Sequence, residues 1–203
     1  MSAKDEFLEA FSLSVKRPGA DHIEIPETVK YRLLAWLKKT DFFTAPASTR
    51  FHGDHESGLV EHSLNVYHRL QEEIKALPVA PSEETVAVCG LLHDICKANF
   101  YKVSQRNAKN EKTGKWEKQP FYQVEDQFPY GHGEKSVFLI ERFMRLKVEE
   151  AVAIRWHMGG FDESVKGGSY AVSGAFEKYP LALLLHVADM EATYLDEGKK
   201  ESV

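Results

Sequence analysis

Apolar residues recur at the spacing of an α-helix through most of this chain. In one segment Leu59, Val66, Leu70 and Ile74 are separated by four or seven positions, which places them on one face of a helix. Prolines, glycines and serines separate this segment from its neighbours. The same pattern predicts helices at roughly 2–17, 26–37, 59–77, 82–97, 132–144, 148–157 and 180–195. We therefore predict an all-α fold in which these helices pack as a bundle.

One segment, residues 101–124, has a different character. Apolar and polar residues alternate before and after a turn at 110–114, as Tyr101 and Val103 illustrate. Positions 102–118 hold six Lys or Arg residues against two Glu. The alternation predicts a small β-hairpin inserted between helices, and the alternative interpretation is a solvated, mobile loop.

The length and composition are typical of one globular domain. The chain has 203 residues, of which 43% are hydrophobic and 28% are charged. We predict a core domain at 51–203 and a helical extension at 1–50 that packs on it. Clustered glycines and prolines predict loops at 40–58 and 159–174.

Charge and cysteine content narrow the cellular setting and the partners. A formal net charge of −5 disfavours a protein that coats nucleic acid over its whole surface. Cys89 and Cys96 form neither a disulfide framework nor a zinc-type CxxC pattern, which favours a reducing compartment. The first residues lack a signal peptide, and the longest apolar run, 181–187, is too short for a membrane helix. We predict a cytoplasmic protein without a membrane partner, and no pattern indicates its oligomeric state.

Ionisable side chains lie on the apolar faces of three predicted helices. His62 lies between Leu59 and Val66, and Asp189 shares a face with apolar residues of the last helix. His93 and Asp94 are adjacent near the end of the fourth helix, so that both can project into one cleft. Burying such groups costs free energy unless they are paired or bound to metal. The pattern therefore indicates one shared metal ion.

Two more histidines fit this pattern. His132 lies at a helix start between Gly131 and Gly133, and His157 ends a helix just before a pair of glycines. Histidine is the commonest metal ligand in proteins. With these two there are six candidate nitrogen or oxygen ligands, which is enough for two ions bridged by an aspartate and a hydroxide.

Five segments in order resemble the HD superfamily of metal-dependent phosphohydrolases. They are Gly-Leu-Val-Glu-His (58–62), Leu-Leu-His-Asp-Ile-Cys-Lys (91–97), Gly-His-Gly-Glu-Lys-Ser (131–136), Ile-Arg-Trp-His-Met-Gly-Gly (154–160) and Leu-His-Val-Ala-Asp-Met (185–190). The resemblance covers roughly residues 50–195, and its motifs are most similar to the bacterial exoribonuclease-type and HD-GYP-type HD domains. It implies an HD-domain helical bundle over the predicted core domain.

The resemblance also implies roles for individual residues. It implies that a metal ion is held by His62, His93, Asp94 and Asp189. It also implies that His132 and His157 hold a second metal. Lys97 matches the family's phosphate-contacting lysine, and Cys96 replaces the glycine common two positions after the aspartate. The exoribonucleases carry a nucleic-acid-binding barrel before this domain, whereas the first 50 residues here are predicted as helix and loop. Nucleic acid is therefore not favoured as the substrate.

These observations predict a phosphoric ester hydrolase that acts on a small phosphorylated substrate, a nucleotide. Its cofactors are two divalent ions, and mixed His and Asp ligation favours Mn, Fe, Ni or Zn over Mg. A metal-activated hydroxide attacks phosphorus, with Asp94 at the catalytic centre and Lys97 stabilising the phosphate charge. The alternatives are a single-metal HD 5′-nucleotidase, a non-catalytic nucleotide-binding HD module and a di-iron oxygenase.

Several further polar residues lie near these motifs. His55 and His52 precede the first ligand helix, and we predict substrate contact for His55. His186, one turn before Asp189, is predicted to lie behind the ligands in the core. Residues predicted to support or border the site are Glu61, Arg155 and Asp162, and those predicted to lie at the surface are His22 and His68.

Overall fold

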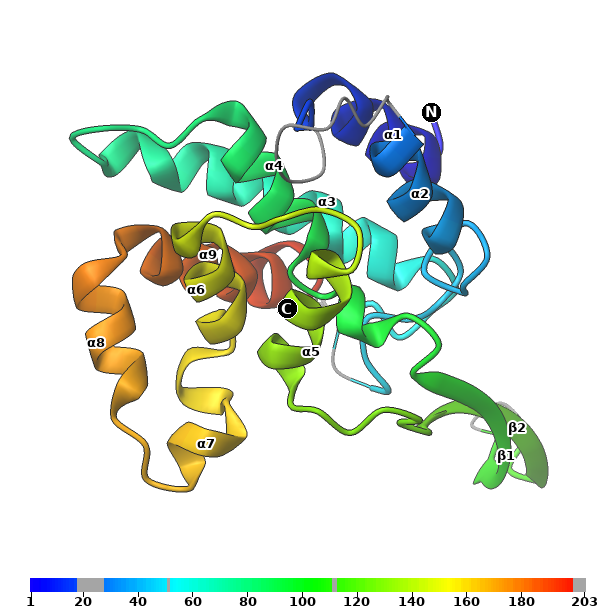
Figure 1. Cartoon of the computed structure of the whole chain (residues 1–203). Coiled ribbons are helices and arrows are strands. Elements are labelled where there is room, and N and C mark those ends of the chain that lie inside the picture. Colours follow the sequence, from blue (N-terminus) through cyan, green and yellow to red (C-terminus); the bar gives the residue numbers. More distant parts are fainter. Residues whose placement is uncertain (18–27, 51, 111–112, 199–203) are drawn as a thin grey trace.

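A computed structural model describes residues 1–17, 28–50, 52–110 and 113–198 of the chain. The helix start predicted at Pro26 and the surface position predicted for His22 lie outside these residues. Figure 1 shows a helical body from which one β-hairpin projects. The predicted all-α fold with a hairpin insertion is confirmed.

The core forms where the helices carrying the sequence motifs pack together. Helix α3 (Gly58–Glu73) packs against α4 (Glu83–Leu92) and α9 (Pro180–Glu191). Helix α9 also packs against α6 (Val148–Trp156), which contacts α5 (His132–Glu141). The apolar stripes that predicted these helices supply the fully buried core residues Leu59, Leu70, Leu91, Ile140, Ile154 and Leu185. Burial of these stripes stabilises the bundle far more than helix propensity does.

The N-terminal part joins the same core. Helix α1 (Ala3–Ser14) packs on α3 and α4, and its Phe7 and Phe11 side chains are fully buried. Helix α2 spans Thr28–Leu37. Beyond α1, the Arg17 guanidinium donates to both carboxylate oxygens of the fully buried Glu150, at 2.6 and 2.7 Å. This bidentate pair links the N-terminal segment to α6.

Serine side chains cap the beginnings of helices α1 and α4. The Ser2 hydroxyl accepts a hydrogen bond from the backbone N–H of Asp5, and the Ser82 hydroxyl accepts one from that of Thr85. Such caps satisfy N–H groups that have no partner inside the helix. Each contributes about 0.5–2 kcal/mol to helix stability.

The predicted hairpin consists of β1 (Tyr101–Lys109) and β2 (Trp116–Val124). The strands are antiparallel, with Tyr101 opposite Val124 and Lys109 opposite Trp116. Most of their side chains are exposed, and the hairpin projects away from the helices (Figure 1). The alternative interpretation of this segment as a loop is therefore wrong.

Two details of the predicted secondary structure are wrong. Segment 159–174 is not a loop, because it contains η3 (Gly159–Phe161), α7 (Glu163–Lys166) and the start of α8 (Ala171–Lys178). The Asp162 side chain caps α7 by accepting a hydrogen bond from the Ser164 backbone N–H. This local bond stabilises the helix start, despite the low helix propensity of the nearby glycines.

The fourth helix is also shorter than predicted. Helix α4 ends at Leu92, and the chain continues through Asp94 into η2 (Ile95–Lys97), a single 3₁₀ turn. The remaining short elements are η1 (Ile74–Ala76) and η4 (Ala192–Asp196), a π-helical extension of α9. Among the described residues, none of the helices has the length and apolar character that crossing a membrane requires.

Candidate metal centre

The six predicted ligands come together at one place in the bundle. They lie on α3 (His62), just after α4 (His93, Asp94), at the start of α5 (His132), just after α6 (His157) and on α9 (Asp189). Four of these side chains are at most 2% exposed, those of His62, His93, Asp94 and His157. The side chains of Asp189 and His132 are 15% and 27% exposed. The bundle therefore buries a cluster of ionisable groups that no apolar contact can satisfy.

Asp94 lies at the middle of this cluster. Its Oδ1 atom is 2.7 Å from Nε2 of His132 and 3.5 Å from Nε2 of His157. Its Oδ2 atom is 2.6 Å from Nζ of Lys97 and 3.6 Å from Nε2 of His62. The two oxygens thus face different neighbours, an arrangement that suits a bridging carboxylate.

Backbone carbonyls orient two of the histidines. The Nδ1–H group of His93 donates to the Gly90 carbonyl at 2.9 Å, and that of His157 donates to the Ile154 carbonyl at 2.7 Å. Both rings therefore turn their Nε2 atoms toward the cluster. The His157 Nε2 atom is buried and has no hydrogen-bond partner among the described residues. A buried nitrogen without a partner is costly, and a metal ion would satisfy it.

Glu197 orients a third histidine, and the sequence patterns missed it. Its carboxylate accepts from Nδ1–H of His62 at 3.0 Å and from the Asn65 amide at 2.9 Å. The π-helical turn η4 brings Glu197 to this position, although it lies eight residues after Asp189. The apolar periodicity of the last predicted helix ends near residue 195, so the sequence pattern does not single out Glu197.

In the absence of metal, protonated histidines and Lys97 balance the negative charge of the carboxylates. Burial opposes charge on His62, but the Asp189 and Glu197 carboxylates outweigh it and raise its pKa to about 9. Burial likewise opposes charge on His132, but Cys96 and Asp94 raise its pKa to about 10. The pKa of Asp94 lies well below its usual range, because Lys97 and the histidines outweigh the effect of burial. Divalent ions would replace this protein-borne positive charge.

The donor set fits divalent metal. Among the described residues, four sets of ligand atoms lie close enough to share an ion. One is His52, His62 and Glu197, and the other three are His62, His93 and Asp94; His93, His157 and Asp189; and Asp94, Cys96 and His132. Imidazole and carboxylate together suit Mn, Fe, Ni, Zn and Co better than Mg, which prefers oxygen ligands. The sets overlap at Asp94 and His93, so adjacent ions would share ligands.

The cluster opens into two hollows that meet beside Asp94. One, of about 890 Å³, is lined by Asp94, Asp189, Arg50 and His52 among others, and the other has a volume of about 590 Å³. Residues that line both hollows are Lys97, His132, Met158, Phe161 and Lys166. Positive and apolar side chains therefore line the part that the two hollows share, and the smaller hollow also has the acidic residues Asp126, Glu134, Asp162 and Glu163 in its lining.

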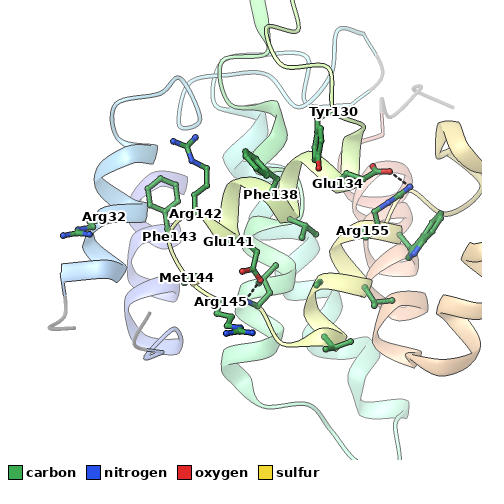
Figure 2. Close-up of a pocket in the computed structure, with 16 residues that line it drawn as sticks. Arg32, Tyr130, Glu134, Phe138, Glu141, Arg142, Phe143, Met144, Arg145 and Arg155 are labelled. Carbon is green, nitrogen blue, oxygen red and sulfur yellow. Dashed lines mark hydrogen bonds and ion pairs between the residues drawn. The ribbon is translucent and has the colours of Figure 1, made fainter. Parts of the chain in front are cut away.

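A larger groove lies elsewhere. It has a volume of about 1070 Å³, and Phe138, Arg142 and Trp156 are among its lining residues (Figure 2). None of the six candidate ligands lines it. Figure 2 also shows Arg155 paired with Glu134 at its edge, and this arginine binds Asp162 at 2.8 Å. Arg155 and Asp162 therefore pair with each other beside the centre rather than with a ligand.

The histidines outside the ligand set differ in their placement. His55 is exposed, pairs with Glu61 at 3.6 Å and does not line the 890 Å³ hollow, so neither residue reaches the cluster. His52 lines that hollow, and both of its ring nitrogens are buried without a partner among the described residues. His186 donates to the His157 carbonyl at 2.7 Å and so supports a ligand from behind. His68 is exposed and contacts Glu6.

Comparison with known proteins agrees with this geometry. The model of one family, described as HD domain, matches residues 59–193, a span that contains all six clustered side chains. No curated protein and no solved structure matches the chain. The match does not distinguish the exoribonuclease-type from the HD-GYP-type of HD domain. It covers well over half of the chain, which therefore belongs to the HD domain family, whose members are in general metal-dependent phosphohydrolases.

Proposed function

We propose that this protein hydrolyses a phosphoester of a small phosphorylated substrate, a nucleotide, with two divalent metal ions. The ions are held by His62, His93, Asp94, His132, His157 and Asp189. The observation that carries the proposal is the buried Nε2 atom of His157, which faces Asp94 Oδ1 at 3.5 Å without a hydrogen-bond partner. Most buried polar side-chain atoms have a hydrogen-bond partner, so an imidazole nitrogen without one, facing a carboxylate at this depth, supports an ion between them.

The arrangement around Asp94 supports two ions rather than one. His132 and His157 lie on the Oδ1 side of Asp94, whereas His62 lies on the Oδ2 side and within 3.2 Å of Asp189. One ion would take His62, His93 and Asp189, and the other would take the remaining two histidines. Asp94 would contribute one oxygen to each.

Divalent metal supplies Lewis acidity, which activates water at neutral pH and stabilises negative charge on a phosphate group. The chain itself supplies a cation that is not a metal ligand. The Lys97 ammonium group, whose side chain is 12% exposed, lies 2.6 Å from Asp94 Oδ2 and lines both hollows. A phosphate in either hollow would meet this cation, which would stabilise charge that develops on its oxygens.

The side chains that line the 890 Å³ hollow support a nucleotide as substrate. Arg50 and Lys166 add positive charge to its lining, whereas Met190 and Tyr194 add apolar and aromatic surface. A nucleotide combines a phosphate with a flat, weakly polar base, and such sites bind both parts through this mixture of side chains. The hollow, at about 890 Å³, has ample room for one.

The experiment is a turnover assay on metal-reconstituted protein with a panel of nucleotides and phosphodiesters. We expect phosphate release with Mn, Fe, Ni or Zn, and little with Mg. Asp94→Ala should abolish both turnover and metal content, because it removes the proposed bridging carboxylate. Asp5→Ala, at a fully exposed aspartate in α1, is the matched control and should change neither. Full metal content in Asp94→Ala, by elemental analysis, would contradict the proposal.

A further inference from the structure

Cys96 lies at the edge of the metal centre, although its thiol has no part in the proposal above. It belongs to η2, two residues after Asp94, and only 2% of it is exposed. Its Sγ atom is 3.6 Å from both ring nitrogens of His132. The side chain also lines the smaller hollow, so it faces space that a ligand can enter.

The second cysteine of the chain shows what an ordinary buried thiol looks like here. Cys89 lies inside α4 and packs in the hydrophobic core with the apolar stripes of the bundle. Cys96 is equally buried but does not belong to that core cluster. Its neighbours are instead Asp94 and His132, with which it forms a group close enough to hold one ion.

The sulfur–nitrogen distance is the one that a shared ion requires. Zinc binds imidazole nitrogen at about 2.0–2.1 Å and thiolate sulfur at about 2.3 Å, so the two atoms lie about 3.6 Å apart in tetrahedral geometry. Because the Cys96 Sγ atom is no closer to one nitrogen of His132 than to the other, a directed S–H···N hydrogen bond does not account for the contact.

We propose that Cys96 is a thiolate ligand of the metal ion held by Asp94 and His132. The proposal rests on the metal centre proposed above and adds one residue to it. On binding, the S–H bond breaks, sulfur bonds the ion and the proton leaves to solvent. The buried, unpartnered Nε2 atom of His157 points to an ion at the same place, since it faces the same carboxylate oxygen of Asp94.

A thiolate changes which metal the centre prefers. Soft sulfur ligands favour Zn, Fe(II) and Co(II), whereas Mg and Mn favour oxygen. Among the residues that the structure describes, the position on the His62 side of Asp94 has only nitrogen and oxygen donors as its nearest groups. The two positions therefore differ in softness, and the chain should bind one zinc ion more tightly than the second.

Cobalt is the probe, because its absorption reports the donor atoms. We expect that Co(II) added to chelator-treated full-length protein produces visible ligand-field bands and a near-ultraviolet band from thiolate-to-cobalt charge transfer. Cys96→Ser should keep the visible bands, lose the near-ultraviolet band and bind zinc at least roughly tenfold more weakly at one position. Cys89→Ser is the matched control and should retain both absorptions, provided that circular dichroism shows all three proteins folded.

Each result discriminates. A near-ultraviolet band that survives in Cys96→Ser, or visible bands without it in the parent, would overturn the assignment of Cys96 and leave the metal centre standing. No cobalt-dependent absorption in the parent would overturn the metal centre and this ligand together. Zinc binding offers a second readout, since the parent should release one more proton than Cys96→Ala. Equal proton release would count against ligation.

Discussion

Individual atoms of the candidate centre divide into those proposed to bind the ions and those that orient the candidate ligands. The Nε2 atoms of His93 and His157 point into the cluster because their Nδ1–H groups are held by backbone carbonyls. His62 is turned the same way by the Glu197 carboxylate. Lys97 differs, because an ammonium group donates only and cannot ligate a metal while protonated. Its contact with Asp94 therefore makes it a partner of a candidate ligand, and phosphate contact is the separate role proposed for it.

Substitution of His157 and of Lys97 should separate these roles. His157→Ala should lose about one ion of two, because His62, His93, Asp94 and Asp189 remain. Lys97→Ala should keep its metal, and its turnover should fall roughly tenfold to 150-fold. This fall corresponds to the loss of one charge-assisted hydrogen bond to phosphate in the transition state. Metal stoichiometry and phosphate release are measured beside the parent. If the parent holds one ion and His157→Ala is fully active, the single-metal nucleotidase becomes the leading interpretation.

The described residues of the hairpin contribute no side chain to the hydrophobic core. Strands β1 and β2 contact each other along their whole length, and Val103 and Trp116 are 65% and 72% exposed. At its base, the Tyr101 hydroxyl donates to the Ala47 carbonyl and so ties the first strand to the body. The helices that carry the ligands pack on one another without the hairpin.

Removing the hairpin should therefore leave the centre intact. Replacing residues 102–123 by a short Gly-Ser linker joins Tyr101 to Val124, which already face each other across the sheet. We expect the free energy of unfolding to change by no more than about 1 kcal/mol, because a two-stranded hairpin is only marginally stable by itself. Metal content should match that of the parent. Loss of metal in a variant that still shows helical circular dichroism would contradict this expectation.

Over the whole molecule, the centre connects parts of the chain that are distant in sequence. Its ligands come from residues as far apart as His62 and Asp189, and from helices that pack through an apolar core. Metal that binds this assembled site and not the unfolded chain stabilises the fold by mass action. At a thousandfold excess over Kd the gain is about 4 kcal/mol.

The melting temperature should accordingly rise with metal, and the gain should depend on pH. Partners raise the pKa of His62 from 6.5 to about 9, so protonated His62 stabilises the metal-free fold fully below pH 6.5. This stabilisation by protonated His62 is lost as the pH rises toward 9. At the higher pH, a metal ion can bind His62 without first displacing its proton. Thermal unfolding with and without chelator at pH 6.5 and pH 9 should show the larger metal-dependent shift at pH 9. Asp94→Ala should show no shift at either pH, and a pH-independent shift in the parent would refute the coupling.

The sequence alone determined the helices and most of the candidate centre. Local chemistry explains this success, because apolar periodicity sets which face of a helix is buried and serine caps set where two helices begin. His62 and Asp189 could be singled out because burying an ionisable group on an apolar face costs free energy unless the group is paired or bound to metal. The alternation around the turn at 110–114 likewise predicted the hairpin, a prediction that the strand pairing confirms.

Only the tertiary structure decided which distant groups meet. Glu197 reaches His62 through a π-helical turn, and Cys96 reaches His132 because α4 ends at Leu92 and gives way to a 3₁₀ turn. Helix pitch at such ends depends on packing against neighbouring helices, which no short sequence window contains. The same reason applies to His55, whose loop position looked suitable but whose side chain faces solvent. Periodicity in the sequence identifies a buried face, and packing alone determines what that face touches.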